Sequence, residues 1–246
     1  MIKLILGNVG SGKTASVVRW MRESKNQRIY TNIDVKLGHV IKLKPEMVIK
    51  KEQKGMKRDG TPIYDMKLNE EYWKEERKKY NNISVVIDEA HTFFNPRRSM
   101  SKLNIIMTDF LALLRRIVGS TGEREGKLIL ITQLSRRLDV IGRDMATDVE
   151  FCVNHYQILC KGCGYCWSET NEVPNKPEKC PNCMSYKLKK QNDYIEVWGF
   201  RDHESYKLWS ESGVRNYYSH YLIHDIKSVF GIYDTLQWDD LTSQYM

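Results

Sequence analysis

The chain alternates between short apolar runs and longer segments whose apolar residues recur at helical spacing. Short apolar runs bounded by polar residues are typical of buried strands, and strands that alternate with helices favour a parallel sheet. We therefore predict an α/β fold with a mainly parallel central sheet. The predicted strands cover residues 2–6, 28–33, 83–91, 127–133, 148–159 and 194–200, and the predicted helices cover residues 15–24, 69–80, 101–119 and 136–146.

One region, residues 42–80, departs from this alternation because it is rich in lysine and glutamate. The stretch "KGMKRDGTP" predicts a turn-rich hinge, and "NEEYWKEERKKY" after it predicts a polar helix. Opposite charges at helical spacings indicate a solvent-exposed helix, with contact to DNA as the alternative.

The first predicted strand runs directly into "GNVGSGKT", which matches the phosphate-loop motif G-x-x-x-x-G-K-[ST] between a strand and a helix. Glycines allow backbone N–H groups to surround phosphate oxygens, and the following helix N-terminus favours negative charge. We expect Lys13 to reach the β- and γ-phosphates of a nucleotide and Thr14 to bind Mg²⁺. The predicted nucleotide-binding residues are Gly7, Asn8, Val9, Gly10, Ser11, Gly12, Lys13 and Thr14.

The strand predicted at residues 83–91 ends in two acids, Asp88 and Glu89. In phosphate-loop proteins the first acid supports Mg²⁺ and the second can polarise an attacking water. A kinase needs no water activator, so the pair favours hydrolysis. The letters "DEAH" also occur in helicases, but the remaining chain is too short for a second RecA-like domain beside a cysteine-rich segment.

Thr132 and Gln133 end a predicted strand that should lie beside the acidic one. A polar side chain there can contact the γ-phosphate and orient water. Arg116, with Arg115 next to it, ends the preceding helix, where it could act across a subunit interface or simply suit a helix C-terminus. The other candidate arginines are Arg124, Arg136, Arg137 and Arg143.

Five of the six cysteines lie in residues 159–183, in two possible metal-binding registers. The first pairs Cys160 and Cys163 with Cys180 and Cys183, as C-x2-C-x16-C-x2-C, and the second replaces Cys160 by Cys166. The first spacing is typical of a zinc ribbon, and four thiolates form a closed structural Zn²⁺ site. We predict the first register, with Cys166 as the alternative ligand.

The charge composition favours one kind of binding partner. The formal net charge is +8, which favours a polyanionic partner such as nucleic acid, although charge alone identifies none. We find no uninterrupted apolar stretch of the ~18 residues that a membrane helix requires, and we expect an intracellular protein. Clustered cysteines inside a cell favour metal binding over disulfides.

Together, "GNVGSGKT", "VVIDEAHTFFNPR", "LILITQLSRRLDVIGRDMA" and the late "VFGIYDT" resemble the Zot-like branch of the FtsK–HerA ATPases. The resemblance implies a RecA-like core, a hexameric ring, and ATP hydrolysis between subunits that moves DNA. Lys13, Thr14, Asp88, Glu89 and Gln133 match the family's positions directly, and Arg116 matches less closely. We expect an ATPase core over residues 1–155, a zinc-ribbon insertion over 156–191, and the end of the core with a tail over 192–246.

Phage members of this branch carry a membrane span, whereas none is predicted here. We therefore expect a DNA translocation or packaging motor of a virus or mobile element in the host cytoplasm. Its expected cofactors are ATP, Mg²⁺ and Zn²⁺, and its expected partners are double-stranded DNA, copies of itself, and capsid or assembly proteins. The alternatives are a nucleotide kinase with a zinc-bearing lid and an ATP-switched DNA-binding assembly protein.

Overall fold

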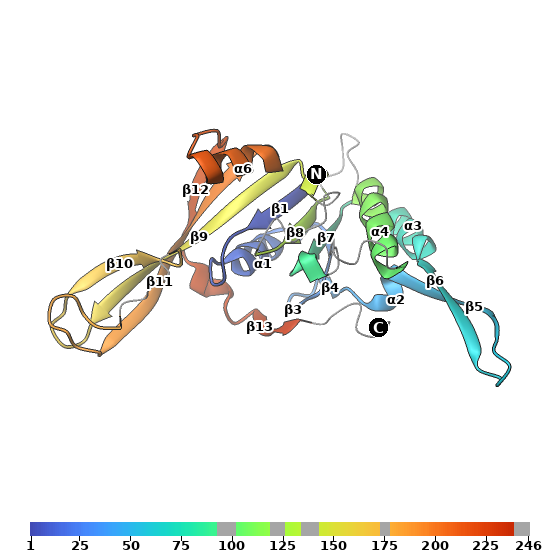
Figure 1. Ribbon diagram of the computed structural model, residues 1–246, viewed down its shortest axis with the longest axis horizontal. Coiled ribbons are helices and arrows are strands. Elements are labelled where there is room, and N and C mark those ends of the chain that lie inside the picture. Colours follow the sequence, from blue (N-terminus) through green and yellow to red (C-terminus); the bar gives the residue numbers. More distant parts are fainter. Residues whose placement is uncertain (93–101, 119–125, 134–142, 173–177, 239–246) are drawn as a thin grey trace.

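The computed structural model describes residues 1–92, 102–118, 126–133, 143–172 and 178–238 (Figure 1). Its strands are β1 (Ile2–Leu6), β2 (Arg28–Thr31), β3 (Ile33–Val35), β4 (Val40–Lys42), β5 (Ile49–Met56), β6 (Pro62–Leu68), β7 (Ile83–Ile87), β8 (Leu128–Ile131), β9 (Asp148–Cys160), β10 (Cys166–Thr170), β11 (Leu188–Phe200), β12 (Ser219–Ile223) and β13 (Tyr233–Trp238). Its helices are α1 (Lys13–Glu23), α2 (Pro45–Val48), α3 (Glu70–Lys79), η1 (Ala90–Thr92), α4 (Lys102–Val118), α6 (His203–Ser212) and η4 (Ile226–Val229).

The central sheet has the strand order β12-β11-β9-β1-β8-β7-β2-β4, with β10 added to β9. The strands from β9 to β4 pair in parallel, whereas β10, β11 and β12 pair antiparallel. The prediction of an α/β fold with a mainly parallel sheet is confirmed. The strand that ends near Gln133, β8, pairs with β7, the strand that leads to Asp88 and Glu89, and Ile87 lies opposite Leu130. The predicted neighbourhood of these two strands is therefore confirmed.

Alternate residues of the parallel strands face two separate cores, which explains why these strands read as continuous apolar runs. One face packs against α3 and α4, where Trp73 and Phe110 are fully buried. The other face packs against α1 and η4, where Val18 and Val229 are fully buried. Both sides of the sheet are thus covered, and the carboxyl ends of its parallel strands form the edge at which α1 begins.

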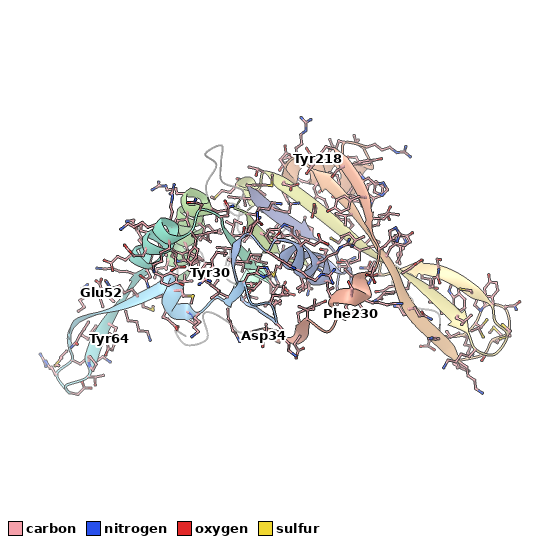
Figure 2. All side chains as sticks on the ribbon, turned by 180° about the vertical axis from the view of Figure 1, so that it is seen from behind. Tyr30, Asp34, Glu52, Tyr64, Tyr218 and Phe230 are labelled. Carbon is pink, nitrogen blue, oxygen red and sulfur yellow. The ribbon has the colours of Figure 1, made fainter. Side chains whose placement is uncertain are left out.

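Two β arms extend from this body at opposite ends in Figure 1. One consists of β5 and β6, and the other of the long strands β9 and β11 with β10 beside them. In Figure 2, Glu52 and Tyr64 mark the first arm. The first arm was not predicted, because most residues beyond its root are polar or charged, with exposed positions on both faces, and they show no regular apolar alternation.

The strands of the second arm continue through the predicted domain boundaries. β9 runs without interruption from Asp148 to Cys160, and β11 returns from Leu188 to Phe200. The cysteine segment is therefore carried on strands that begin in the central sheet. Helix α6 was not predicted, and most of the helix expected over residues 136–146 lies outside the described residues. None of the described helices combines the length and apolar composition that crossing a bilayer requires.

Candidate nucleotide site and cysteine cluster

The predicted phosphate loop connects β1 to α1 and depends on glycine conformations. Gly7, Gly10 and Gly12 have φ values of 147°, 76° and 87°, which L side chains rarely adopt. A Cβ on Gly12 would lie 2.2 Å from Cδ1 of Ile195, so the loop packs directly against β11. The loop leads the free N–H groups of the first turn of α1 toward the edge where a phosphate would bind.

Lys13 is buried and folds back over the loop. Its Nζ donates to the carbonyl oxygens of Gly7 at 2.8 Å and Asn8 at 3.0 Å, and to Ser11 Oγ at 3.4 Å. Burial lowers the pKa of Lys13, while nearby acids, Asp88 among them, oppose that shift. The ammonium is held by neutral oxygens, which phosphate oxygens can replace.

The predicted magnesium ligands lie together at the ends of two elements. Thr14 Oγ1 donates to Asp88 Oδ2 at 2.8 Å. Asn32, which follows β2, holds the Asp88 backbone from both sides: its Oδ1 accepts from the Asp88 N–H at 2.8 Å and its Nδ2 donates to the Asp88 carbonyl at 3.0 Å. Burial raises the pKa of Asp88, an effect opposed by the Thr14 hydrogen bond. A cation bound here would offset that cost.

The second acid, Glu89, has a left-handed backbone with φ of 50°. Gln133 Nε2 donates to Glu89 Oε1 at 3.0 Å, and His91 Nδ1 lies 3.2 Å from Glu89 Oε2. The same His91 atom lies 3.1 Å from Thr132 Oγ1. Strand pairing between β7 and β8 thus places an acid and an amide in contact at the edge where the phosphate loop opens. His91 ends the "DEAH" stretch but was not among the predicted site residues, and no motif indicated the position of Asn32.

The base of the cysteine arm also contacts the phosphate loop. Asn154 Nδ2 and the Tyr156 hydroxyl donate to the Gly10 carbonyl at 3.0 and 3.2 Å. Glu172, which follows β10, accepts from Asn8 Nδ2 at 2.8 Å. Burial raises the pKa of Glu172, while the Asn8 hydrogen bond opposes the shift. These contacts join residues more than 140 positions apart, so no local sequence signal indicates them.

The late "YDT" motif lies near the same edge. Tyr233 begins β13, which pairs with β3 opposite Val35. Burial raises the pKa of Tyr233 to about 12, and the charge of Asp88 adds to the shift. This part of the chain therefore lies beside β3 and within electrostatic reach of Asp88.

Arg116 lies far from these groups within the chain. It is exposed near the end of α4. That end of α4 lies beside the start of β7, because a Cβ added to Gly126 would lie 2.8 Å from the Val118 carbonyl oxygen and 2.2 Å from the Ile83 carbonyl oxygen. Ile83 begins β7, whereas Asp88 follows its other end. Arg116 therefore cannot serve the site of its own chain, and action on a neighbouring subunit stays a prediction. Arg124, Arg136, Arg137 and the side chain of Arg115 lie outside the described residues.

At the tip of the second arm, the structure brings together the sulfur atoms of the first register. Those of Cys160, Cys163, Cys180 and Cys183 all lie within 4.8 Å of one another. Cys166 is the first residue of β10 and is not in this group.

Two matching turns build this cluster. In the first, Cys160 N donates to Tyr165 O and Gly164 N donates to Cys160 O, both at 2.9 Å. In the second, Cys180 N donates to Ser185 O and Met184 N donates to Cys180 O, again both at 2.9 Å. Gly164 and Met184 both have left-handed φ values, 76° and 57°. Each turn thus aims two thiols at one point.

The cluster fits a tetrahedral soft metal ion. Gly162 N and Asn182 Nδ2 donate to the sulfurs of Cys160 and Cys163, and hydrogen bonds of this kind favour thiolates. The pKa of Cys163 is lowered to about 6, with the backbone N–H of Tyr165 as the largest cause. Four thiolates with backbone and amide donors around them are the chemistry of a structural Zn²⁺ site.

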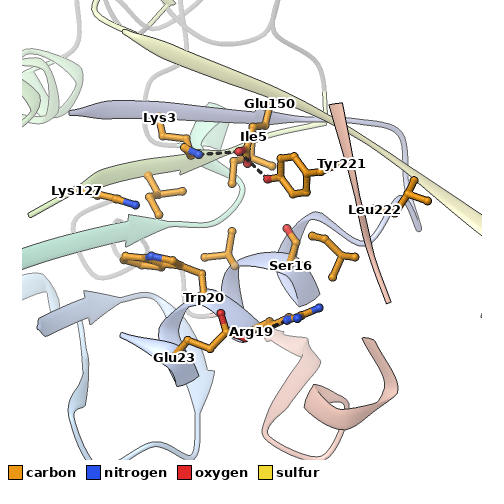
Figure 3. Close-up of a pocket in the computed structure, with 13 residues that line it drawn as sticks. Lys3, Ile5, Ser16, Arg19, Trp20, Glu23, Lys127, Glu150, Tyr221 and Leu222 are labelled. Atoms are coloured by element: carbon orange, nitrogen blue, oxygen red, sulfur yellow. Dashed lines mark hydrogen bonds and ion pairs between the residues drawn. The ribbon is translucent and has the colours of Figure 1, made fainter. Parts of the chain in front are cut away.

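A separate pocket of about 270 Å³ lies between α1 and the sheet (Figure 3). Lys3 Nζ lies 2.6 Å from Glu150 Oε1 and 2.9 Å from Asp148 Oδ2, and the Tyr221 hydroxyl donates to Glu150 at 2.8 Å. Burial alone would lower the pKa of Lys3, but the two carboxylates raise it to about 12. These polar groups satisfy one another through ion pairs and a hydrogen bond, so we assign the pocket a structural role.

The parallel sheet, the phosphate loop at its carboxyl edge, and the facing acids with Gln133 together define the class of protein as a P-loop NTPase. The family comparison is more particular. The family model "Zonular occludens toxin (Zot)" matches residues 1–156, which is more than half of the chain, so the protein belongs to the Zot family. The resemblance predicted from the motifs is thereby confirmed. No curated protein sequence matches the chain.

Solved structures with a similar arrangement include the N-terminal domain of zonular occludens toxin from Neisseria meningitidis, at 17% identity and a TM-score of 0.48 over 95% of this chain and 98% of that one. Another is the genome packaging NTPase B204 from Sulfolobus turreted icosahedral virus 2 in complex with AMPPCP, at 14% identity and 0.40 over 90% and 96%. A third is B204, the DNA-packaging ATPase from Sulfolobus Turreted Icosahedral Virus, at 15% identity and 0.40 over 90% and 96%.

Proposed function

We propose that this protein hydrolyses ATP with Mg²⁺ and uses that reaction to move DNA during the packaging or assembly of a virus or mobile element. The observation that carries the proposal is the contact between Gln133 and Glu89 beside the loop that holds Lys13. A kinase has no need for this pair, because its nucleophile is the acceptor substrate. The positive net charge supports a nucleic-acid partner.

In the proposed reaction, the β- and γ-phosphates replace the carbonyl oxygens that now hold Lys13. Thr14 and Asp88 would bind the Mg²⁺, which neutralises phosphate charge. The oxygen of a water molecule attacks the γ-phosphorus, the bond from that phosphorus to the β–γ bridging oxygen breaks, and ADP leaves. Glu89 accepts the proton from this water while Gln133 fixes the orientation of the Glu89 carboxylate. His91 contacts the other carboxylate oxygen of Glu89 and limits its rotation.

The site of a single chain lacks an arginine among the groups described around Lys13 and Glu89. A ring in which Arg116 or another arginine reaches the neighbouring site would supply one, and would make hydrolysis depend on assembly. We propose a homo-oligomer, with a hexamer as the expected size, acting in the cytoplasm together with capsid or assembly proteins.

For the cysteine cluster we propose one structural Zn²⁺, held by Cys160, Cys163, Cys180 and Cys183. Few apolar residues of this tip are buried, so a metal would supply the stability that a small core cannot. We also propose that residues 156–191 are an extension of the core strands β9 and β11, because both strands run continuously from the central sheet into the arm.

The decisive experiment measures ATP hydrolysis by the wild type and by Glu89→Gln, with and without duplex DNA. We expect DNA-stimulated turnover in the wild type, and loss of turnover with retained ATP binding in the variant. Glu211→Gln, the same change at an exposed glutamate of α6 away from the site, serves as the matched control and should behave as the wild type. A wild type that transfers phosphate to nucleoside monophosphates instead of to water would establish the kinase alternative.

A wild type that binds ATP and DNA without turnover would establish the remaining alternative, an ATP-switched assembly protein. The oligomeric state should be measured in the presence of ATP and DNA, together with these rates. Full activity of a strict monomer would refute the shared site.

A further inference from the structure

The first β arm, which we call the basic arm, comprises residues 49–68 and pairs β5 with β6 from Ile49 opposite Leu68 to Met56 opposite Pro62. It forms a two-stranded sheet of its own, without hydrogen bonds to the central sheet. Figure 1 shows it leaving the body beside α2 and α3 and ending free of the described elements. Its root packs on the core through Ile49 and Leu68, whereas the exposed outer part of the ribbon does not, so the function of that part is to be sought at its surface.

Charge is distributed unevenly along the basic arm. At its root the charges are paired: Lys67 Nζ lies 2.7 Å from Glu52 Oε2, and Lys50 Nζ lies 3.0 Å from Glu71 Oε2. At its tip they are not. Lys54, Lys57 and Arg58 are exposed, and among the described residues their side chains have no ion-pair partner.

Apolar side chains accompany this unpaired charge. Met56, Ile63 and Tyr64 are 68%, 42% and 55% exposed, although each is large and apolar or aromatic. In Figure 2, Tyr64 lies farther along the basic arm than Glu52 and points away from the body. Nothing in the described part of the chain covers these three side chains.

We propose that the basic arm binds duplex DNA, with its ribbon in a groove, its three tip cations on phosphates, and its apolar tip against base edges. A two-stranded ribbon is one of the two elements that the major groove admits. Three unpaired cations near the end of the arm, Lys54 in β5 and Lys57 and Arg58 in the turn, are suited to the closely spaced phosphates on either side of a groove. This inference rests on the proposed function, of which it names the contact element.

The same surface suits other classes of partner less well. Insertion into a membrane requires a larger apolar face, and here the three apolar side chains stand among several charged ones. An acidic protein surface could satisfy the cations, but it would not require an extended ribbon. Ion pairs at the root hold the base of the arm in place, and the unpaired cations at its tip are free to contact a polyanion.

The test is fluorescence anisotropy with a labelled duplex of mixed sequence, at several salt concentrations and without nucleotide. The test variant combines Lys54→Ala, Lys57→Ala and Arg58→Ala. The matched control combines Lys25→Ala, Lys207→Ala and Arg215→Ala, which removes the same types and number of exposed charges elsewhere. We expect the test variant to bind at least tenfold more weakly, and its salt slope to fall by roughly 2–3, since each phosphate contact contributes about 0.9. The control should change both quantities far less.

Two further measurements complete the design. Tyr64→Ala with Met56→Ser should weaken binding while leaving the salt slope unchanged, because it removes contacts that are not ionic. Basal ATPase activity without DNA should be the same in all variants, which also shows that they fold.

Equal loss of affinity in the test and control variants would overturn the proposal, as would retained DNA binding by the test variant. Loss of self-association with unchanged DNA affinity would instead assign the arm to contacts between subunits. Because the assay needs no hydrolysis, failure of the proposed ATPase would not affect its outcome.

Discussion

Glu172, at the base of the cysteine arm, accepts a hydrogen bond from Asn8 of the phosphate loop at 2.8 Å. The two residues are 164 positions apart, and β9, β10 and the loop itself bring them together. A carboxylate at this place is unexpected, because the loop is built to receive phosphate oxygens. The contact suggests that Glu172 holds Asn8 until a nucleotide displaces it.

We predict that Glu172→Gln binds ATP more tightly than the wild type. Removing one negative charge near the phosphates should be worth about 1 kcal/mol, which is about a fivefold lower Kd. Because burial raises the pKa of Glu172, lowering the pH should neutralise it and tighten binding by the wild type more than by the variant. Isothermal titration at several pH values measures both effects. Glu169→Gln is the control, since Glu169 accepts from Trp167 and not from the loop. Equal affinities for the wild type and Glu172→Gln would contradict the prediction.

Asn32 offers a separate test, of how the magnesium acid is positioned. It is 1% exposed, and it satisfies both the N–H and the carbonyl of Asp88. Asn32→Ala leaves these two groups without partners, so we expect unfolding to become easier by about 1–3 kcal/mol, together with weaker Mg²⁺-dependent ATP binding.

Asn32→Asp is the informative comparison, because it keeps the acceptor for the Asp88 N–H and loses the donor. It should be no more stable than the alanine variant, because it buries a carboxylate facing the Asp88 carbonyl, but it should keep more of the Mg²⁺-dependent ATP binding, because the Asp88 N–H stays held. Urea unfolding and nucleotide titration with and without Mg²⁺ distinguish the two contributions. Nucleotide binding that falls equally with and without Mg²⁺ would mean that Asn32 does not act through Asp88.

Much of this site could be predicted from local sequence, and the reason is physical. A loop that wraps phosphate needs glycines followed by lysine at fixed spacing, and an acid at a strand end needs only the strand before it. Asn32, Asn154 and Glu172 carry no such signal, because each acts through a contact set by strand order. The basic arm was not predicted for a different reason: beyond its root its strands have no buried face, so their sequence lacks the alternation that marks a strand.

Gln133 should matter for turnover more than for binding. Its amide donates to one oxygen of Glu89 at 3.0 Å, and none of its contacts with the described residues reaches the phosphate loop. We expect Gln133→Ala to lower kcat by about a hundredfold, a loss typical of removing one well-placed polar group, with ATP Kd nearly unchanged. Gln133→Glu should be at least as inactive, because it places two carboxylates side by side. Steady-state kinetics and nucleotide titration separate the two quantities, and a variant that loses only affinity would be evidence against this role.

The cysteine cluster predicts which thiol is dispensable. Cys160→Ser removes a sulfur that lies 3.6 Å from that of Cys183, so the purified variant should hold less than one equivalent of Zn²⁺. Cys166→Ser should keep one full equivalent, because Cys166 is outside the cluster. Elemental analysis and competition with a chelator give the stoichiometry and the affinity. Full metal content in Cys160→Ser together with loss in Cys166→Ser would shift the register by three residues.

The two matching turns of that cluster differ at one position, and the difference can be measured. Gly164 and Met184 occupy the same left-handed place, with φ of 76° and 57°, but only glycine adopts that conformation without steric cost. Met184 is 62% exposed, so its side chain contributes little packing in return. Met184→Gly should therefore stabilise the metal-bound turn by about 0.5 kcal/mol, after allowance for the greater freedom of glycine in the unfolded chain. Gly164→Ala should have the opposite effect: no atom lies within 4 Å of the added Cβ, so backbone strain is its main cost. Chelator competition should rank metal affinity as Met184→Gly, wild type, Gly164→Ala. The reverse order would show that the turns do not carry the strain inferred from their backbone.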